Sequence, residues 1–404
     1  MMNPLPVVRA ELRRASASAI AAVTLIAIAV ALGVGVTAQE RALRVGSARA
    51  ADPFDLVVGA RGSATQLVLS SIYLQPGGLE LISGEVVDRV MAERGVTWAA
   101  PIAFGDSHRG APVVGTTAAY VTRGETRRVE RGRVFAARNE AVVGADVALA
   151  LGAQFSPAHG ETARAAAPDD AVHSGVDYRV VGMLPRTGTP WDRAILVPIE
   201  AVWRLHARPT GHARGIETIG PPWEAGASGA SAVIVKAMSV ADAYRLRGRY
   251  RGVDSLAVFP AEVLVELYGT LGDARDLLAI VALLTQGLVV AAVMLAVLAG
   301  HAERRRLFGV LRALGASRAY VFAAVWLHAT CIIAAGGLVG LALGWQTAAL
   351  VSHVVRARTG LALLATVSGP EIRLVLGLIL AGAAAAILPA WRAHRQPVAS
   401  LLRG

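Results

Sequence analysis

Four apolar, almost charge-free stretches limit what this chain can fold into more than any other feature of its sequence. A bilayer's hydrocarbon core, roughly 30 Å thick, is crossed by about 20 helical residues. Three stretches of about this length cover residues 15–38, 277–300 and 319–345, and a shorter one covers 374–391. With 54% hydrophobic residues, the 404-residue chain is too apolar for an ordinary soluble enzyme. The sequence therefore predicts a membrane protein with four spanning helices.

The positions of the arginines predict how these helices are oriented. Basic clusters precede the first stretch, fill the loop between the second and third, and follow the fourth. Their members are Arg9, Arg13 and Arg14, then Arg304, Arg305 and Arg306, then Arg392 and Arg395. Because cytoplasmic flanks of membrane helices collect Lys and Arg, we expect both termini in the cytoplasm. The long segment after the first span is then external.

The first stretch has a second interpretation as a cleaved signal peptide, since Val36-Thr37-Ala38 has the small-residue spacing of a cleavage site. Its apolar run is longer than the roughly 7 to 15 residues of a signal-peptide core, which favours a retained helix. Retention also provides the even number of spans that the arginines require.

The sequence changes character between residues 39 and 275. Short β-branched runs predict strands at 55–58, 141–143, 178–181, 194–197 and 232–235. Helical patterns occur at 83–94, 145–151, 200–206, 241–249 and 260–268. Two stretches rich in Gly, Ala, Pro and Ser, 156–174 and 208–231, are expected to be loops. The predicted fold is an α+β membrane protein with a large mixed α/β domain inserted after the first of its four helices.

These patterns predict three domains. Residues 1–40 form the N-terminus and first membrane helix, and 41–275 form the external domain, whose two ends continue the membrane helices as a stalk. Residues 276–404 hold helices two to four, with a cytoplasmic loop at 301–318.

The formal charge of +11 does not indicate a nucleic-acid partner, because all but Lys236 of the 40 basic residues are arginines, which is typical of codon bias.

Three sets of residues resemble one known family. Residues 303–318, which read Glu-Arg-Arg-Arg-Leu-Phe-Gly-Val-Leu-Arg-Ala-Leu-Gly-Ala-Ser-Arg, are similar to the cytoplasmic loop of FtsX-like permeases. This family includes MacB-type efflux and lipoprotein-releasing transporters. The tail at 389–398 resembles the family's ending. The external motifs at 132–135, 142–144 and 180–182, with Ala148 and Pro198, are similar to its periplasmic core domain.

The resemblance implies a type VII ABC permease in a bacterial inner membrane, with both termini cytoplasmic and a large periplasmic domain. Its expected partners are a cytoplasmic ABC ATPase that uses ATP and Mg, a second permease copy, identical or paralogous, membrane lipid, and a periplasmic adaptor or carrier. Export or extraction of a substrate is the main expectation. Lipoprotein release, and regulation of a periplasmic cell-wall hydrolase without transport, stay open. Segments 55–63 and 187–193 look like marks of a subgroup whose cargo they do not identify.

An ATPase site of its own is not expected in this chain. A P-loop needs a lysine that follows glycine and reaches the phosphates, but Lys236 stands in Ile-Val-Lys-Ala-Met. A Gly-x-Ser-x-Gly nucleophile elbow is also missing where a strand meets a helix. Pairs such as His206 with His212, or His159 with His173, lack a recognised ligand spacing. We therefore expect no catalytic residue, no metal and no directly bound cofactor.

Coupling to the ATPase is predicted at the loop between the second and third spans. If 304–315 is helical, Leu307, Leu311 and Leu314 share one face, while Arg305 and Arg312 project elsewhere. The alternative is that the leucines lie on the membrane and the arginines only set the topology. The predicted coupling residues are Glu303, Arg304, Arg305, Leu307, Gly309, Leu311, Arg312, Leu314 and Gly315.

A glycine stripe predicts close helix packing in the third span. Gly336, Gly340 and Gly344 recur every fourth residue and so lie on one helical face, where a second helix can approach closely. The partner helix belongs either to this chain or to a second copy.

Overall fold

The computed structural model describes residues 3–159, 177–213, 215–303 and 305–395, with many side chains between 271 and 308 left out. The chain divides into two compact units. Unit 1 comprises Met1–Leu43, Leu271–Val354 and Leu363–Gly404, and unit 2 comprises Arg44–Thr270 and Val355–Ala362.

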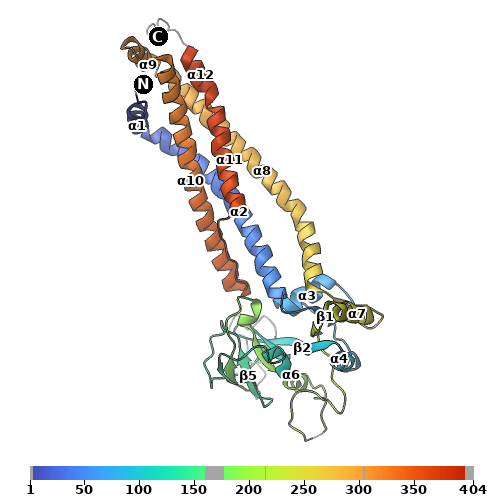
Figure 1. The fold of residues 1–404 in the computed structure, drawn as a ribbon. Coiled ribbons are helices and arrows are strands. Elements are labelled where there is room, and N and C mark those ends of the chain that lie inside the picture. Colours follow the sequence, from blue (N-terminus) through green and yellow to red (C-terminus); the bar gives the residue numbers. More distant parts are fainter. Residues whose placement is uncertain (1–2, 160–176, 214, 304, 396–404) are drawn as a thin grey trace. The chain divides into compact units, whose positions relative to one another are not determined.

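Unit 1 is helical (Figure 1). Its helices, some of which continue into unit 2, are α1 (Leu5–Arg14), α2 (Ser16–Ala51), α8 (Pro260–Glu303), α9 (Arg305–Ala313), α10 (Arg318–Thr359), α11 (Gly369–Ala385) and α12 (Ile387–Arg395). Pro389 lacks the N–H that would bond to the carbonyl of Ala385, and this accounts for the break between α11 and α12.

Three of the four predicted spans are confirmed. Among the described residues, three helices are long and apolar enough to cross a membrane: Ser16–Ala51, Arg318–Thr359 and Gly369–Arg392. The remaining predicted span, 277–300, lies within α8, where the side chains of 292–300 fall outside the described residues. That span stays a prediction.

The core of unit 1 is made by three helices. Ile26, Val30 and Val34 of α2 pack with Ile333 of α10 and Val375 of α11, and all five are nearly inaccessible to solvent. These β-branched residues therefore form the face of α2 that contacts the neighbouring helices, whereas Ile20 and Ile28 of the same helix are exposed.

Unit 2 is built on one mixed sheet with the strand order β11-β1-β10-β2-β3-β9-β5-β8-β4, in which β6 also pairs with β8 and β7 with β2. The strands are β1 (Leu56–Gly59), β2 (Val96–His108), β3 (Ala111–Thr116), β4 (Arg131–Gly132), β5 (Glu140–Val143), β6 (Gln154–Phe155), β7 (Ala158–His159), β8 (Tyr178–Met183), β9 (Ile195–Pro198), β10 (Ala232–Ala237) and β11 (Leu256–Val258). Parallel pairing occurs at β3 with β9 and at β5 with β8.

Strand β2 joins the two halves of this sheet. Its first part, Val96 to Ile102, pairs antiparallel with β10, and its second part, from Ala103 to His108, pairs with β3. The register is irregular between Ala103 and Asp106. One long strand with a bulge thus serves both halves, since a bulge bends a strand and increases its twist.

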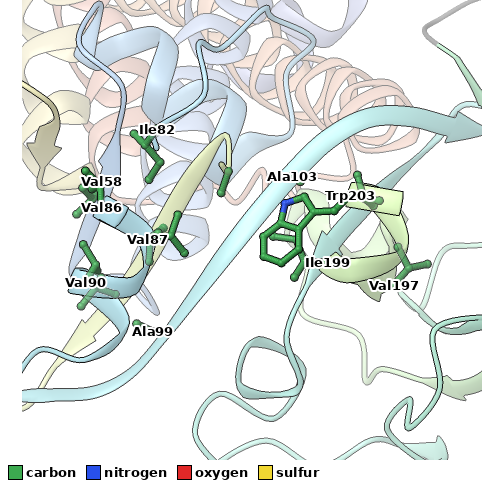
Figure 2. Close-up of a cluster of buried hydrophobic side chains, with 14 of the residues drawn as sticks. Val58, Ile82, Val86, Val87, Val90, Ala99, Ala103, Val197, Ile199 and Trp203 are labelled. Carbon is green, nitrogen blue, oxygen red and sulfur yellow. The ribbon is translucent and has the colours of Figure 1, made fainter. Parts of the chain in front are cut away.

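Short helices cover the sheet: α3 (Ala64–Tyr73), α4 (Gly84–Met91), α5 (Ala118–Thr122), α6 (Ile199–Leu205) and α7 (Val240–Tyr250), with the 3-10 turn η3 at Pro190–Arg193. Figure 2 shows Val86, Val87 and Val90 of α4 among the buried side chains that fill the core. Trp203 of α6 lies in the same cluster and donates its indole N–H to the carbonyl of Gly229 at 3.0 Å.

The predicted strands are present, but the helix predicted at 145–151 is wrong. That stretch is irregular because its backbone bonds elsewhere: the amide of Asp146 donates to the carbonyl of Asp192 at 2.7 Å, and Gly144 lies against the backbone of η3. The predicted loop at 156–174 falls mostly outside the described residues. The 208–231 stretch is irregular as predicted, yet it is held by buried Trp223.

Candidate functional site

The segment between α9 and α10 reverses the chain within four residues. The amide of Ala316 donates to the carbonyl of Leu311 and the amide of Gly315 donates to that of Arg312, which is a Schellman ending of α9. Gly315 has φ +99°, a conformation that favours glycine. The hydroxyl of Ser317 then accepts from the amide of Tyr320 and starts α10. The Gly-Ala-Ser sequence therefore accounts for the whole turn.

The predicted leucine face of this loop is divided. Leu311 is half-buried and packs on a cluster of Val321, Val325 and Ala390, whereas the Leu314 side chain is 80% exposed. Val310, one turn before Leu314, is 45% exposed. Arg312 is half-buried, and Gly309 is buried inside α9. Among the side chains that are described here, Val310 of α9 and Leu314 just after it are exposed and apolar, while Leu311 faces the helices of its own unit.

The side chains of the remaining predicted coupling residues are outside the described part of the chain. Arg304 is not described, and the side chains of Glu303, Arg305 and Leu307 are left out. The backbone of Arg305 and Leu307 belongs to α9.

The glycine stripe of α10 lies against α2. An added Cβ on Gly336, Gly340 or Gly344 would be 2.6–2.7 Å from the Cβ of a β-branched residue of α2, which real Cβ atoms essentially never show. The three opposing residues are Ile26, Val30 and Val34. The partner of this stripe is therefore a helix of the same chain, and the two backbones approach as closely as glycine allows.

Helix α1 was not predicted from the sequence. It ends in Arg13 and Arg14 and carries a buried acid, Glu11, whose Oε2 lies 3.8 Å from Nδ1 of His328 on α10. The alternation of apolar and basic residues over 5–14 was the signal that could have revealed an amphipathic helix.

The 55–63 segment has structural contacts that account for several of its residues. Asp55 accepts from Nζ of Lys236 at 2.7 Å and from the amide of Ala237 at 3.0 Å. Gly59 leaves room for the side chain of Leu67, and Ser63 caps α3 by accepting from the amide of Gln66. Together these contacts attach β1 to β10 and set the start of α3.

The 187–193 segment is organised by one buried carboxylate. Asp192 is 2% exposed and accepts from the amides of Thr187 and Gly188 at 2.8 and 2.7 Å, and from the Thr187 hydroxyl at 2.7 Å. The neighbouring Trp191 ring lies 4.6 Å from that of Tyr120. The turn is therefore fixed from both sides.

This turn holds the end of α10 and the segment that follows it. The amide of Ala362 donates to the carbonyl of Gly188 at 2.8 Å, and Nη1 of Arg193 donates to the carbonyl of Arg358. Gly360 has φ +75°, and a Cβ there would lie 3.0 Å from Cα of Pro190. All these residues belong to unit 2.

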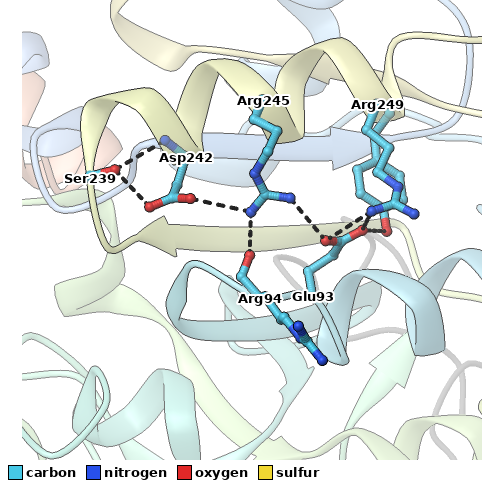
Figure 3. A network of polar contacts seen from close by, with 7 residues as sticks. Glu93, Arg94, Ser239, Asp242, Arg245 and Arg249 are labelled. Atoms are coloured by element: carbon cyan, nitrogen blue, oxygen red, sulfur yellow. Dashed lines mark hydrogen bonds and ion pairs between the residues drawn. The ribbon is translucent and has the colours of Figure 1, made fainter.

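Glu93 organises a polar network where α4 meets α7 (Figure 3). It accepts from the Tyr250 hydroxyl at 2.9 Å and forms ion pairs with Arg249 at 3.0 Å and Arg245 at 3.5 Å. Burial, followed by the hydrogen bond to Glu93, raises the pKa of Tyr250 to about 12. The hydroxyl is therefore a constant donor at neutral pH.

The histidines considered as metal ligands in the sequence have acidic neighbours where the structure describes them. His206 lies 3.5 Å from Asp106, while His212 lies 3.9 Å from Glu200 and 3.5 Å from Glu224. His173, which was considered together with His159, is outside the described residues. In the part of the chain that is described, no group of three or more His, Cys, Asp or Glu side chains is arranged to hold a metal ion.

Comparisons with known proteins match most of the chain. The MacB-like periplasmic core domain matches residues 16–249, and the FtsX-like permease C-terminal domain matches residues 279–398. Among solved structures, the crystal structure of the periplasmic region of MacB from Actinobacillus actinomycetemcomitans is similar at 11% identity and a TM-score of 0.34, covering 55% of this chain and 95% of that chain. No curated protein matches.

Proposed function

We propose, since this chain belongs to the FtsX-like permeases with a MacB-like periplasmic core domain, that it couples ATP hydrolysis by a separate subunit to movement of its periplasmic domain. The family resemblance expected from the sequence is confirmed by both matches, and such permeases pair with ABC ATPase subunits. In this proposal, that movement exports or extracts a substrate. The ATP and Mg are held by the partner.

The length of the helices is the observation that carries this proposal. Helix α2 is continuous over 36 residues, or about 54 Å, and α10 over 42 residues, or about 63 Å. Each exceeds a hydrocarbon core of roughly 30 Å by several turns. A helix without a break transmits displacement along its axis, so both can carry motion from one side of the membrane to the other.

The ATPase contact is proposed at α9 and the turn that follows it, where Val310 and Leu314 supply exposed apolar anchors. Arg305, Arg312 and the acidic Glu303 complete the proposed surface. Leu311 has a supporting role, since it packs on α10 and α12 and so holds α9 in place.

The topology proposed from the arginines places this loop in the cytoplasm, with four spans and both termini inside. Residues 41–275 then form the periplasmic domain, and a second permease copy completes the assembly. Lipoprotein release and regulation of a cell-wall hydrolase would both use the same coupling of ATP hydrolysis to movement of the periplasmic domain, so both stay as alternative functions. Labelling of a cysteine at Ser317 from outside the cell would contradict this topology.

Co-purification tests the ATPase contact. The full chain is purified from membranes and the associated ABC ATPase is quantified by mass spectrometry. Leu314→Asp and Val310→Asp should each reduce the ATPase at least tenfold. Val253→Asp is the matched control, because Val253 is 80% exposed in unit 2 and distant in sequence. Undiminished ATPase in both α9 variants would refute the docking surface.

A further inference from the structure

Unit 2 contains a cleft of about 490 Å³, in the size range of small-molecule sites. It is bounded by the loop after α3, the irregular part of β2, the η3 turn and the last turn of α10. All of its lining residues belong to unit 2. Nothing in the proposed function assigns a role to it.

One wall of the cleft carries two arginines, Arg193 and Arg358. Several other arginines of unit 2 are paired with acids, as Arg133 is with Glu140 and Arg186 with Asp146. Within the described residues, neither Arg193 nor Arg358 forms an ion pair with a carboxylate. Arg358 is exposed and Arg193 is half-buried, so both guanidinium groups can receive an anion.

A hydrogen bond and a rigid turn bring Arg193 to the backbone of Arg358. Nη1 of Arg193 donates to the backbone carbonyl of Arg358, and the Asp192 network holds the turn from which Arg193 projects. Gly360 permits the approach, since any Cβ there would meet Pro190 and Arg193. These contacts hold the guanidinium group of Arg193 at the cleft and place the backbone of Arg358 beside it, from which the exposed Arg358 side chain projects.

Part of the remaining lining of the cleft is apolar. Leu74 and Pro76 come from the loop after α3, Phe104 from the irregular part of β2, and Pro190 from η3. Asp106 also borders the cleft, but its side chain is only 1% exposed and lies 3.5 Å from His206. The accessible charge in the cleft is accordingly positive.

We propose that this cleft binds an anionic group, a phosphate or a carboxylate, that is attached to an apolar chain. The guanidinium groups would form charge-assisted hydrogen bonds with the anion, while Phe104, Leu74 and Pro76 cover the chain. The ligand would bridge the η3 turn and the end of α10. Its role as a substrate rests on the proposed function, but its binding does not.

Binding is measured by isothermal titration of the purified full chain in a neutral maltoside detergent, without ATPase. The probes are hexyl phosphate, the neutral hexan-1-ol and inorganic phosphate. We expect saturable binding of hexyl phosphate that is at least tenfold tighter than that of either other probe. Equal binding of hexan-1-ol or of inorganic phosphate would overturn the proposal, and so would no binding of hexyl phosphate.

Arg193→Gln and Arg358→Gln should each weaken hexyl phosphate binding at least fivefold. Arg358 lies on the exposed helix surface, so its variant keeps the test valid even if Arg193→Gln disturbs the turn. Arg356→Gln is the matched control, in the same helical turn but outside the cleft lining. Unchanged affinity in Arg358→Gln, or equal loss in Arg356→Gln, would refute the assignment.

A second experiment distinguishes the two classes of natural ligand, a membrane lipid and a soluble amphiphile. Dihexanoyl phosphatidate is compared with hexyl phosphate as a competitor for the cleft. Tighter binding of the two-chain molecule supports a membrane lipid, and tighter binding of the single-chain molecule supports a soluble amphiphile. Because the ATPase is absent, failure here leaves the co-purification result at α9 unaffected.

Discussion

Arg41 of α2 donates a hydrogen bond from Nη1 to Oε1 of Glu371 at 2.6 Å, and the Glu371 side chain is completely inaccessible to solvent. Oε2 of the same carboxylate accepts from the amide and hydroxyl of Ser368, at 2.9 and 3.0 Å, in a capping box at the start of α11. The pair joins two membrane helices that are more than 300 residues apart in sequence. A buried charge in this position requires its partner.

Arg41→Gln should destabilise unit 1 by about 3 kcal/mol, because it leaves the carboxylate of Glu371 buried without its cation. Thermal unfolding of the full chain in nanodiscs measures the change. Glu371→Gln on the Arg41→Gln background should recover part of the loss, since the double variant has no buried charge. Equal stability of Arg41→Gln and the wild type would contradict the role of the pair.

Gly340→Ala and Gly377→Ala should have opposite effects. Alanine favours a helix over glycine by about 1 kcal/mol, so Gly377→Ala, where a Cβ meets nothing within 4 Å, should stabilise slightly. At Gly340 the Cβ would lie 2.6 Å from Cβ of Val30 and 2.7 Å from the carbonyl oxygen of Ala27. That variant should separate α10 from α2 and lower the melting temperature. If both substitutions changed the melting temperature in the same direction, the close approach of α10 to α2 would not matter for stability.

Glu140→Gln should reduce stability at neutral pH but not in acid. The hydrogen bond from Arg133, with amide donors at Ala136 and Ala137, lowers the pKa of Glu140 below its ordinary value of 4.5. A lowered folded pKa means that the carboxylate stabilises the fold above the unfolded pKa, and that this contribution is lost as the pH falls through the folded pKa.

The expected loss for Glu140→Gln is about 1 kcal/mol or less at about pH 7, since Arg133 is 56% exposed and solvent screens the pair. Melting temperatures of wild type and variant at about pH 7 and about pH 3 provide the comparison. A difference in melting temperature between wild type and variant that grows toward acid pH would contradict this prediction.

Glu200→Ala should release the 208–231 loop. Oε1 of this buried residue accepts from the amide of Gly220 and from the indole of Trp223, both at 2.7 Å. Limited proteolysis should cleave the loop at least tenfold faster in the variant. Glu200→Gln is the matched control because its amide oxygen can accept the same bonds, and it should stay close to the wild-type rate.

Local patterns predicted much of this architecture. The β-branched runs at 55–58, 141–143, 178–181, 194–197 and 232–235 overlap β1, β5, β8, β9 and β10, because such residues pack well on a pleated surface. The Ser-x-x-Glu spacing at 368–371 was a readable capping signal that the sequence analysis missed. The long β2 strand was also missed, since its Gly, Pro and Asp interrupt the pattern and its pairing depends on distant β10 and β3.

The sequence by itself determined which segments are apolar enough for a membrane, where five β-branched strands lie, and which residues are small enough for close helix packing. Only the tertiary structure decided that Leu311 faces inward while Leu314 faces outward, and that residues 145–151 bond to η3 instead of forming a helix. It also brought Arg193 beside Arg358, 165 residues further along the chain. Periodicity specifies which face of a helix a residue occupies, but the neighbour of that face is chosen by contacts between distant segments.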